Sequence, residues 1–186
     1  MFACKNNNIK AIQILTKDPL RINPNLQDFK LRTALHISVY AVSPQCVDLL
    51  ARMPNVNMNL VDDFGLNPVF TSLYKRTCRL FDSMMIACRE RNANQSKENQ
   101  KYNIDFTKRD HFSQNLLHYA IRIQYIPAIQ LLIKICNVNE TDSKGTSSFH
   151  LACSTCNIEI MEYLVVNLGT TDELQDKIDD NNIDGK

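Results

Sequence analysis

Histidine and cysteine are the residues of this sequence whose types and spacing could support metal or redox chemistry. Three of the four histidines are the last residue of similar tetrapeptides, namely His36, His118 and His150. Cys153 and Cys156 form a CxxC pair, but no second pair and no histidine pair accompanies it at zinc-ligand spacing. We assign the histidines and the CxxC to structural roles, with redox or metal use of the CxxC as the alternative, and expect no metal and no cofactor.

Other features of the composition argue against catalysis, nucleic-acid binding and membrane insertion. The 186 residues include only four glycines, and no nucleotide-binding glycine loop or hydrolase signature occurs. The net charge is +1, which argues against a dedicated nucleic-acid binder. Charge is uneven, with seven basic and three acidic residues in 1–60 and five against ten in 111–186. No apolar run approaches the ~20 residues of a membrane span.

An internal repeat organises the chain. Thr-Ala-Leu-His at 33–36 recurs as Asn-Pro-Val-Phe at 67–70, Asn-Leu-Leu-His at 115–118 and Ser-Ser-Phe-His at 147–150. Each is followed two positions later by a small residue, namely Ser38, Ser72, Ala120 and Ala152. Small residues in one column allow neighbouring helices to approach closely, so we predict that this column is buried where repeats stack.

A second pattern, Asn-x-x-Asp-x-x-Gly, lies between the repeats. It is complete at 59–65 and 139–145, and degraded copies occur at 25–31, 107–113 and 179–185. Glycine accepts a positive φ in such a turn at little steric cost. Leu31 and Ser113 replace it in two loops, which we expect to be distorted.

The recurring columns resemble those of the ankyrin-repeat family over nearly the whole chain. The resemblance implies an all-α solenoid of stacked helix-turn-helix units with hairpin-like loops, in which the repeated histidine hydrogen-bonds to loop backbone. The spacings of 34, 48 and 32 residues between histidine positions are close to the ~33-residue ankyrin period, except for the middle one. Because both ends cut through repeats, we expect a piece of a longer array. The predicted repeats are 1–32 (partial), 33–66, 67–114, 115–146 and 147–182, with 183–186 starting a further one.

The third repeat contains an insertion of about 14 residues, placed at about 86–103. This segment is polar and lacks an apolar period. It is interpreted either as a solvated loop or frayed extension of the second helix, or as a docking loop.

The resemblance also implies where a partner would bind, because ankyrin partners most often touch the loop tips and the concave first helices. Phe29, Phe64 and Phe112 are assigned to one loop column, and they either bind a partner or pack loop against loop. The predicted partner-binding residues are Phe29, Lys30, Arg32, Tyr40, Phe64, Leu66, Tyr74, Lys75, His111, Phe112, Arg122 and Lys144. Aromatic and arginine side chains of this kind dominate interface energetics.

The function expected from these observations is a non-catalytic scaffold that binds a protein partner. Basic neighbours of the aromatic residues favour an acidic, partly apolar partner segment. We expect no nucleic acid, small-molecule substrate or membrane contact. The alternatives are the cytosolic ankyrin domain of a transient receptor potential-type channel and a kappa-B inhibitor-like masking regulator.

Seven cysteines without a secretory signal predict a cytoplasmic protein, with the nucleus as the alternative compartment.

Overall fold

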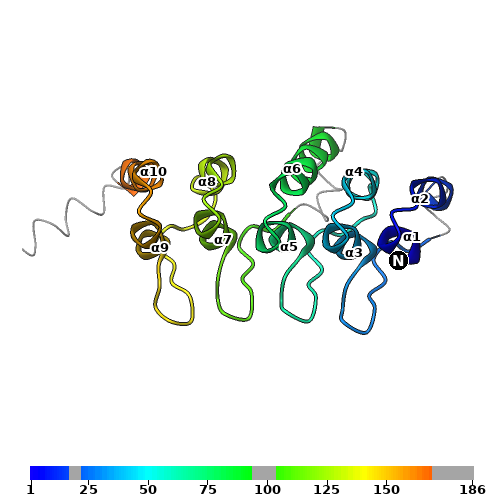
Figure 1. Cartoon of the computed structure of the whole chain (residues 1–186), viewed down its shortest axis with the longest axis horizontal. Coiled ribbons are helices and arrows are strands. Elements are labelled where there is room, and N and C mark those ends of the chain that lie inside the picture. The colour runs from blue at the N-terminus through cyan, green and yellow to red at the C-terminus, as the bar shows by residue number, and fades with distance from the viewer. Residues whose placement is uncertain (17–21, 94–103, 169–186) are drawn as a thin grey trace, which may run out of the picture. The chain divides into compact units, whose positions relative to one another are not determined.

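The computed structural model describes residues 1–16, 22–93 and 104–168, and within them the chain is helical, with no strand (Figure 1). The parts of the predictions that concern 94–103 and 169–186, including the start of a further repeat at 183–186, lie outside the described residues. The helices are α1 (Phe2–Lys5), α2 (Ile9–Thr16), α3 (Ala34–Tyr40), α4 (Pro44–Ala51), α5 (Pro68–Tyr74), α6 (Cys78–Ala93), α7 (Leu116–Arg122), α8 (Ile126–Leu132), α9 (Ser148–Thr155) and α10 (Ile158–Leu168).

The repeated tetrapeptides begin the first helix of each pair because they supply its N-cap. The side chains of Thr33, Asn67, Asn115 and Ser147 each accept a hydrogen bond from the backbone N–H three residues later. In the three copies that contain histidine, its ring accepts from the N-cap backbone and completes a capping box. Caps of this kind are worth about 1 kcal/mol each, which matters for helices of only seven or eight residues.

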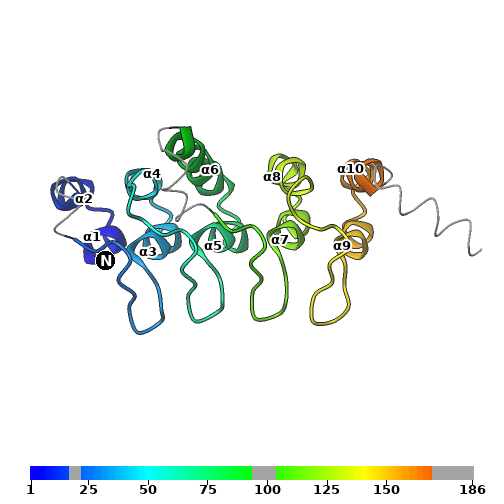
Figure 2. The ribbon, with the colours of Figure 1, turned by 180° about the vertical axis from the view of Figure 1, so that it is seen from behind.

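The N-terminal unit, Met1–His111, consists of three helix pairs. The first helices α1, α3 and α5 contact one another in succession, and the second helices α2, α4 and α6 do the same. The loops before α3 and α5 extend away from the second helices, as Figures 1 and 2 show. Loop tips and first helices of this unit therefore share one side, opposite the second helices.

The C-terminal unit, which begins at Phe112, repeats this arrangement with two pairs. Helix α7 contacts α8 and α9, and α10 contacts α9 and α8. The loop before α9 extends away from α8 and α10 (Figure 2). Both units thus have the helix-turn-helix architecture that the sequence predicts.

The core of each unit lies between the two rows of helices. Ser38, Ser72, Ala120 and Ala152 are completely buried, which confirms the prediction for the small-residue column. Larger apolar side chains fill the space beside them, including Leu35, Phe70 and Phe81 in the first unit and Leu117 and Ile129 in the second. Each such side chain contributes about 1.5–3 kcal/mol of hydrophobic stabilisation.

The tight turn between the two helices of a pair contains a residue with positive φ. Its φ is 49° to 57°, and the residues at this position are Asn7, Val42, Arg76, Gln124 and Cys156. Left-handed backbone is costly for residues other than glycine and asparagine. The short turn therefore imposes a conformation that four of these five residues do not favour.

The degraded loop at Leu31 keeps the turn geometry, contrary to the expected distortion. Leu31 has a φ of 55° and its N–H donates to the Asp28 carbonyl at 2.9 Å. Gly65 has a φ of 75° and makes the equivalent bond to Asp62 at 3.0 Å. Ser113 also has a positive φ, of 59°. The hydrogen bonds of the loop therefore outweigh the backbone strain of a side chain in this region.

Helix α6 accounts for the first part of the predicted insertion, because it extends over 16 residues to Ala93. Arg91 lies in this extension and is 91% buried, although the segment reads as polar. Its guanidinium donates to the carbonyls of Ala51, Pro54 and Val56 at 3.4, 3.3 and 3.1 Å. A cation at the C-terminal end of α4 also interacts favourably with the helix dipole. The extension is thus packed onto the preceding repeat.

We predict that Arg91→Met destabilises the protein by about 1–3 kcal/mol, because the carbonyl of the last residue of α4 and two carbonyls of the following segment lose their donor. Arg89→Met is the matched control, since Arg89 lies on the same helix and is exposed. Urea unfolding followed by circular dichroism measures both. Equal stability of the two variants would show that Arg91 does not hold the extension in place.

Candidate functional site

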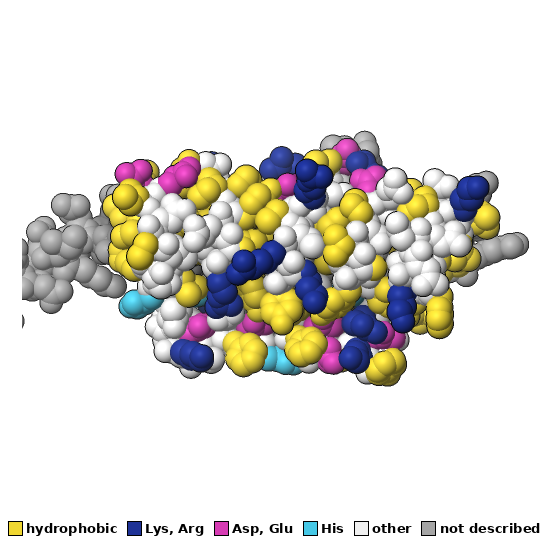
Figure 3. Space-filling view, viewed as in Figure 1, with side chains coloured by type: hydrophobic (Ala, Val, Ile, Leu, Met, Phe, Trp, Pro, Cys, Tyr) yellow, Lys and Arg dark blue, Asp and Glu magenta, His cyan; other side chains and the backbone are white. Residues whose placement is uncertain are grey.

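Three exposed aromatic side chains of the N-terminal unit lie on its loops and at the end of a first helix. Phe29 is 89% exposed, Phe64 59% and Tyr74 54%. Hydrophobic and basic side chains lie among one another on the visible face of this unit (Figure 3). The alternative in which the phenylalanines pack loop against loop would bury them, and the observed exposure disfavours it. Large exposed aromatic side chains close to cations are typical of a binding surface.

Two assignments of the sequence analysis need correction. Leu66 is only 3% exposed, so its side chain belongs to the core and leaves the candidate surface. Phe29 does not occupy the position of Phe64 in the turn. Asp28 accepts from the N–H of Lys30, whereas Asp62 accepts from the N–H of Phe64, so Lys30 is the equivalent of Phe64.

The loop turns are fixed by an aspartate that accepts two backbone N–H groups. Asp62 Oδ1 accepts from Phe64 and Leu66 at 3.0 and 3.1 Å. Asp28 does the same with Lys30 and Arg32, and Asp142 with Lys144 and Thr146, all at 2.9 Å. Neighbouring loops are also linked, since Asp63 N–H donates to the Lys30 carbonyl at 3.1 Å. The backbone beneath the exposed rings is therefore held in place.

Tyr40 joins the first-helix surface of the N-terminal unit to the next loop. Its hydroxyl donates to Asp62 Oδ2 at 3.0 Å. Burial, together with the charge of Asp62, raises the pKa of Tyr40, so the hydroxyl stays a donor at neutral pH. The guanidinium of Arg32 and the ammonium of Lys75 lie 5.9 and 5.2 Å from its ring centroid. We call Arg32, Tyr40 and Lys75 the Tyr40 cluster.

The C-terminal unit makes the same connection through different side chains. Arg122 occupies the position of Tyr40, four residues after the histidine, and donates to Gln114 Oε1 at 3.1 Å. Gln114 in turn donates to Asp142 Oδ2 at 3.1 Å. Arg122 also lies 5.5 Å from the ring centroid of Tyr119. Gln114 is buried, and its bridging role follows from its neighbours rather than from its type.

The remaining predicted residues of this unit lie on its surface. Phe112 is 62% exposed, and Lys144 is exposed in the turn of Asp142. The hydrogen bonds that Asp142 accepts outweigh the effect of its burial and lower its pKa to about 2, so it is ionised at neutral pH.

His36 and His118 are buried and connect each first helix to the following loop. Their Nε2 atoms lie 3.0 Å from the Leu66 carbonyl and 3.2 Å from the Thr146 carbonyl. A carbonyl only accepts, so Nε2 must donate, while Nδ1 accepts from the N-cap N–H. Burial lowers the pKa of both rings. This confirms the structural role expected from the resemblance.

The other two histidines differ from this pair. His150 is exposed and its Nδ1 contacts Ser147, as in the other capping boxes. His111 is also exposed and packs against Gly65, where an added Cβ would lie 2.7 Å from His111 Cδ2. Glycine at position 65 is thus favoured both by the positive φ and by the ring of His111 beside it.

The CxxC residues are exposed free thiols with different positions in the fold. Cys153 lies in α9, and Cys156 is the positive-φ residue of the turn that follows. Within the described ranges, no group of three or more potential ligands is arranged to hold a metal ion.

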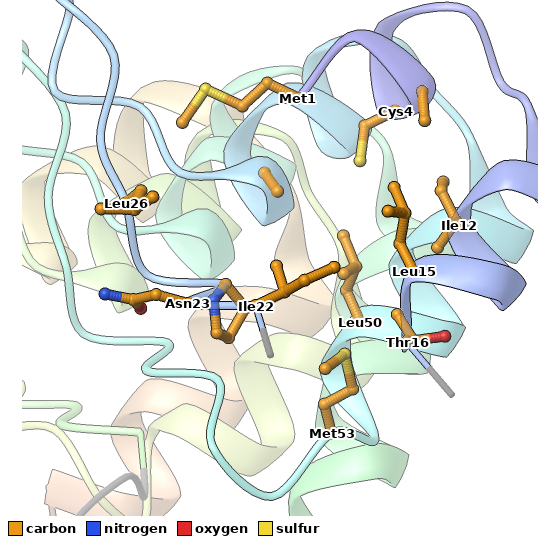
Figure 4. Close-up of a pocket in the computed structure, with 13 residues that line it drawn as sticks. Met1, Cys4, Ile12, Leu15, Thr16, Ile22, Asn23, Leu26, Leu50 and Met53 are labelled. Carbon is orange, nitrogen blue, oxygen red and sulfur yellow. The ribbon is translucent and has the colours of Figure 1, made fainter. Parts of the chain in front are cut away.

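The N-terminal unit also contains an apolar cavity of about 250 Å³ between α1, α2, α4 and the loop at 22–26 (Figure 4). Ile12, Leu15, Leu50 and Met53 line it together with Cys4, whose thiol is buried. Burial raises the pKa of Cys4, so the thiol stays protonated at neutral pH. Among the described residues that line the cavity, none has a charged side chain that could orient a polar ligand.

The comparison with protein families identifies the class to which the chain belongs. The model for ankyrin repeats, in three copies, matches residues 84–176, which is half of the chain. The chain belongs to the ankyrin-repeat family. Ankyrin repeats are generally protein–protein interaction modules and are typically not catalytic. No curated protein matches the sequence significantly. None of the helices in the described part is long and apolar enough to cross a membrane.

We predict that stability falls as the pH is lowered from about 7 to about 5.5. Burial lowers the pKa of His36 and His118 in the folded state, so the unfolded chain binds protons first and is favoured below its own histidine pKa of about 6.5. Urea unfolding at both pH values measures the loss. The double variant His36→Gln, His118→Gln should lose less stability over the same interval, and an equal loss would contradict this origin.

Proposed function

We propose that this chain is a non-catalytic protein-binding module that contacts its partner through its loop tips and first helices. The observation that supports this most strongly is the exposure of Phe29 and Phe64 on turns whose backbone is fixed by Asp28 and Asp62. A rigid turn loses little conformational entropy when it binds, so its exposed rings are effective anchors.

The partner that fits this surface has an acidic, partly apolar segment. Exposed Lys30 and Lys75 accompany the aromatic residues of the N-terminal unit, and Arg122 and Lys144 accompany Phe112 in the C-terminal unit. Cations around apolar anchors speed the encounter with an acidic segment and favour it over a basic one.

The cytoplasm is the compartment we propose, with the nucleus as the alternative. The seven cysteines are free thiols, as is usual in a reducing compartment. The two larger contexts expected from the sequence, a channel and a masking regulator, stay predictions.

Affinity capture from cell extract, followed by binding measurements with the purified partner, tests the proposal. We expect the double variant Phe29→Ala, Phe64→Ala to lose at least about 2 kcal/mol of binding free energy, because both anchors are truncated. Ile86→Ala is the matched control, since Ile86 is 49% exposed on the second helix α6. Unchanged affinity of the double variant, with its helical content intact, would contradict binding through these loops.

A further inference from the structure

Two cations from different elements converge on the ring of Tyr40. Arg32 comes from the loop before α3, and Lys75 follows the last residue of α5. Their charged groups lie 5.9 and 5.2 Å from the ring centroid. The hydroxyl of Tyr40 is anchored to Asp62 at 3.0 Å, which fixes the position of the ring. The Tyr40 cluster thus presents two positive charges from a defined position.

The two cations differ in how they are neutralised. Arg32 donates to Asp28 Oδ2 through Nε and Nη2 at 3.0 and 2.7 Å. The ion pairs of the described residues do not include Lys75, whose ammonium is held by the ring alone. A cation–π contact uses none of the three N–H donors of an ammonium group. Lys75 can therefore donate to the carboxylate of a ligand.

The nearby carboxylates of Asp28 and Asp62 do not pair with the ammonium of Lys75. Asp62 is occupied by two loop N–H groups and by Tyr40, and Asp28 is occupied by Arg32 and its own turn. Asp63 is exposed and close enough to contribute to the raised pKa of Arg32, although less than Asp28 does. Asp63 would therefore compete with a negatively charged ligand for the cations of the Tyr40 cluster.

We propose that the Tyr40 cluster is the anchor point for a glutamate or aspartate side chain of the protein partner, with Lys75 as the residue that selects it. The inference rests on the proposed function and specifies which part of the surface recognises the acidic segment. Phe64 is exposed in the turn that Asp62 closes, and Tyr74 is exposed directly before Lys75 in the chain. These two rings receive the apolar residue beside the carboxylate. A basic segment is disfavoured because Lys75 repels it.

Nuclear magnetic resonance titration of the full chain with two synthetic peptides tests the anchor. Each peptide is acetylated and amidated and has one phenylalanine, flanked on both sides by two glutamates in one peptide and by two glutamines in the other. We expect the glutamate peptide to shift the backbone amides around Tyr40 and Lys75, and the glutamine peptide to shift them much less. Added salt should weaken the binding of the glutamate peptide, because exposed charges are screened within about 10 Å.

Two substitutions with opposite expected effects on the affinity for the glutamate peptide make the test specific. Lys75→Gln should weaken binding of the glutamate peptide about fivefold, the loss expected for one exposed ion pair of about 1 kcal/mol. Asp63→Asn should strengthen it, because the competing carboxylate is removed. Arg79→Gln is the control, since Arg79 is an exposed cation on α6, and it should leave the affinity unchanged.

Three results would overturn the proposal: equal binding of the two peptides, no shifts with the glutamate peptide at millimolar concentration, or unchanged affinity in Lys75→Gln. The proposed function is tested separately by the captured partner. A partner that depends on Phe29 and Phe64 but not on Lys75 would leave the function standing and remove the anchor. A glutamate peptide that depends on Lys75, without any such partner, would leave the anchor and remove the function.

Discussion

The structure depends on a recurring constraint, which is that the loops after α3 and α7 are each held by the first helix that precedes them. His36 donates to the Leu66 carbonyl, and Tyr40 donates to Asp62 in the same loop. In the C-terminal unit, His118 and Gln114 make the equivalent bonds to Thr146 and Asp142. Because Asp62 and Asp142 also organise their own turns, a single pair of contacts fixes both the position and the shape of the loop. In these two places, the first helix thereby fixes where the next repeat begins.

This constraint explains how aromatic side chains can remain exposed without loss of order. The turn that contains Phe64 is closed by Asp62, so its conformation does not depend on burial of the Phe64 ring. The same carboxylate that closes the turn through Oδ1 accepts the hydroxyl of Tyr40 on Oδ2, and it thereby positions the ring on which Lys75 lies. Asp62 therefore has two roles, since it closes the turn and positions the proposed binding surface. That surface is thus formed by the same contacts that connect the repeats. A partner would find this surface already formed, so little of its binding energy would be needed for ordering.

The sequence predicted the helix pairs, their caps and the buried small residues because these features depend on local spacing. Most of the predicted binding residues are also exposed, since residues such as Phe64, Tyr74 and Lys75 lie next to recognisable columns. Three features could not be found in this way. Leu66 looked like a loop residue, but its side chain enters the core. Leu31 lacks the expected glycine and still adopts the turn, because its loop hydrogen bonds compensate for the strain. Arg91 lies in a polar segment and is buried because distant carbonyls need a donor.

The tautomers of His36 and His118 are the most direct test of the link between helix and loop. Long-range proton–nitrogen correlation spectra distinguish a ring protonated at Nε2 from one protonated at Nδ1, and a pH titration of the same signals reports when each ring becomes charged. The account predicts the neutral Nε2–H form for both rings at neutral pH, persisting below the ordinary histidine pKa of about 6.5. An Nδ1–H tautomer, or charging at the ordinary pKa, would show that the histidines do not hold the loops.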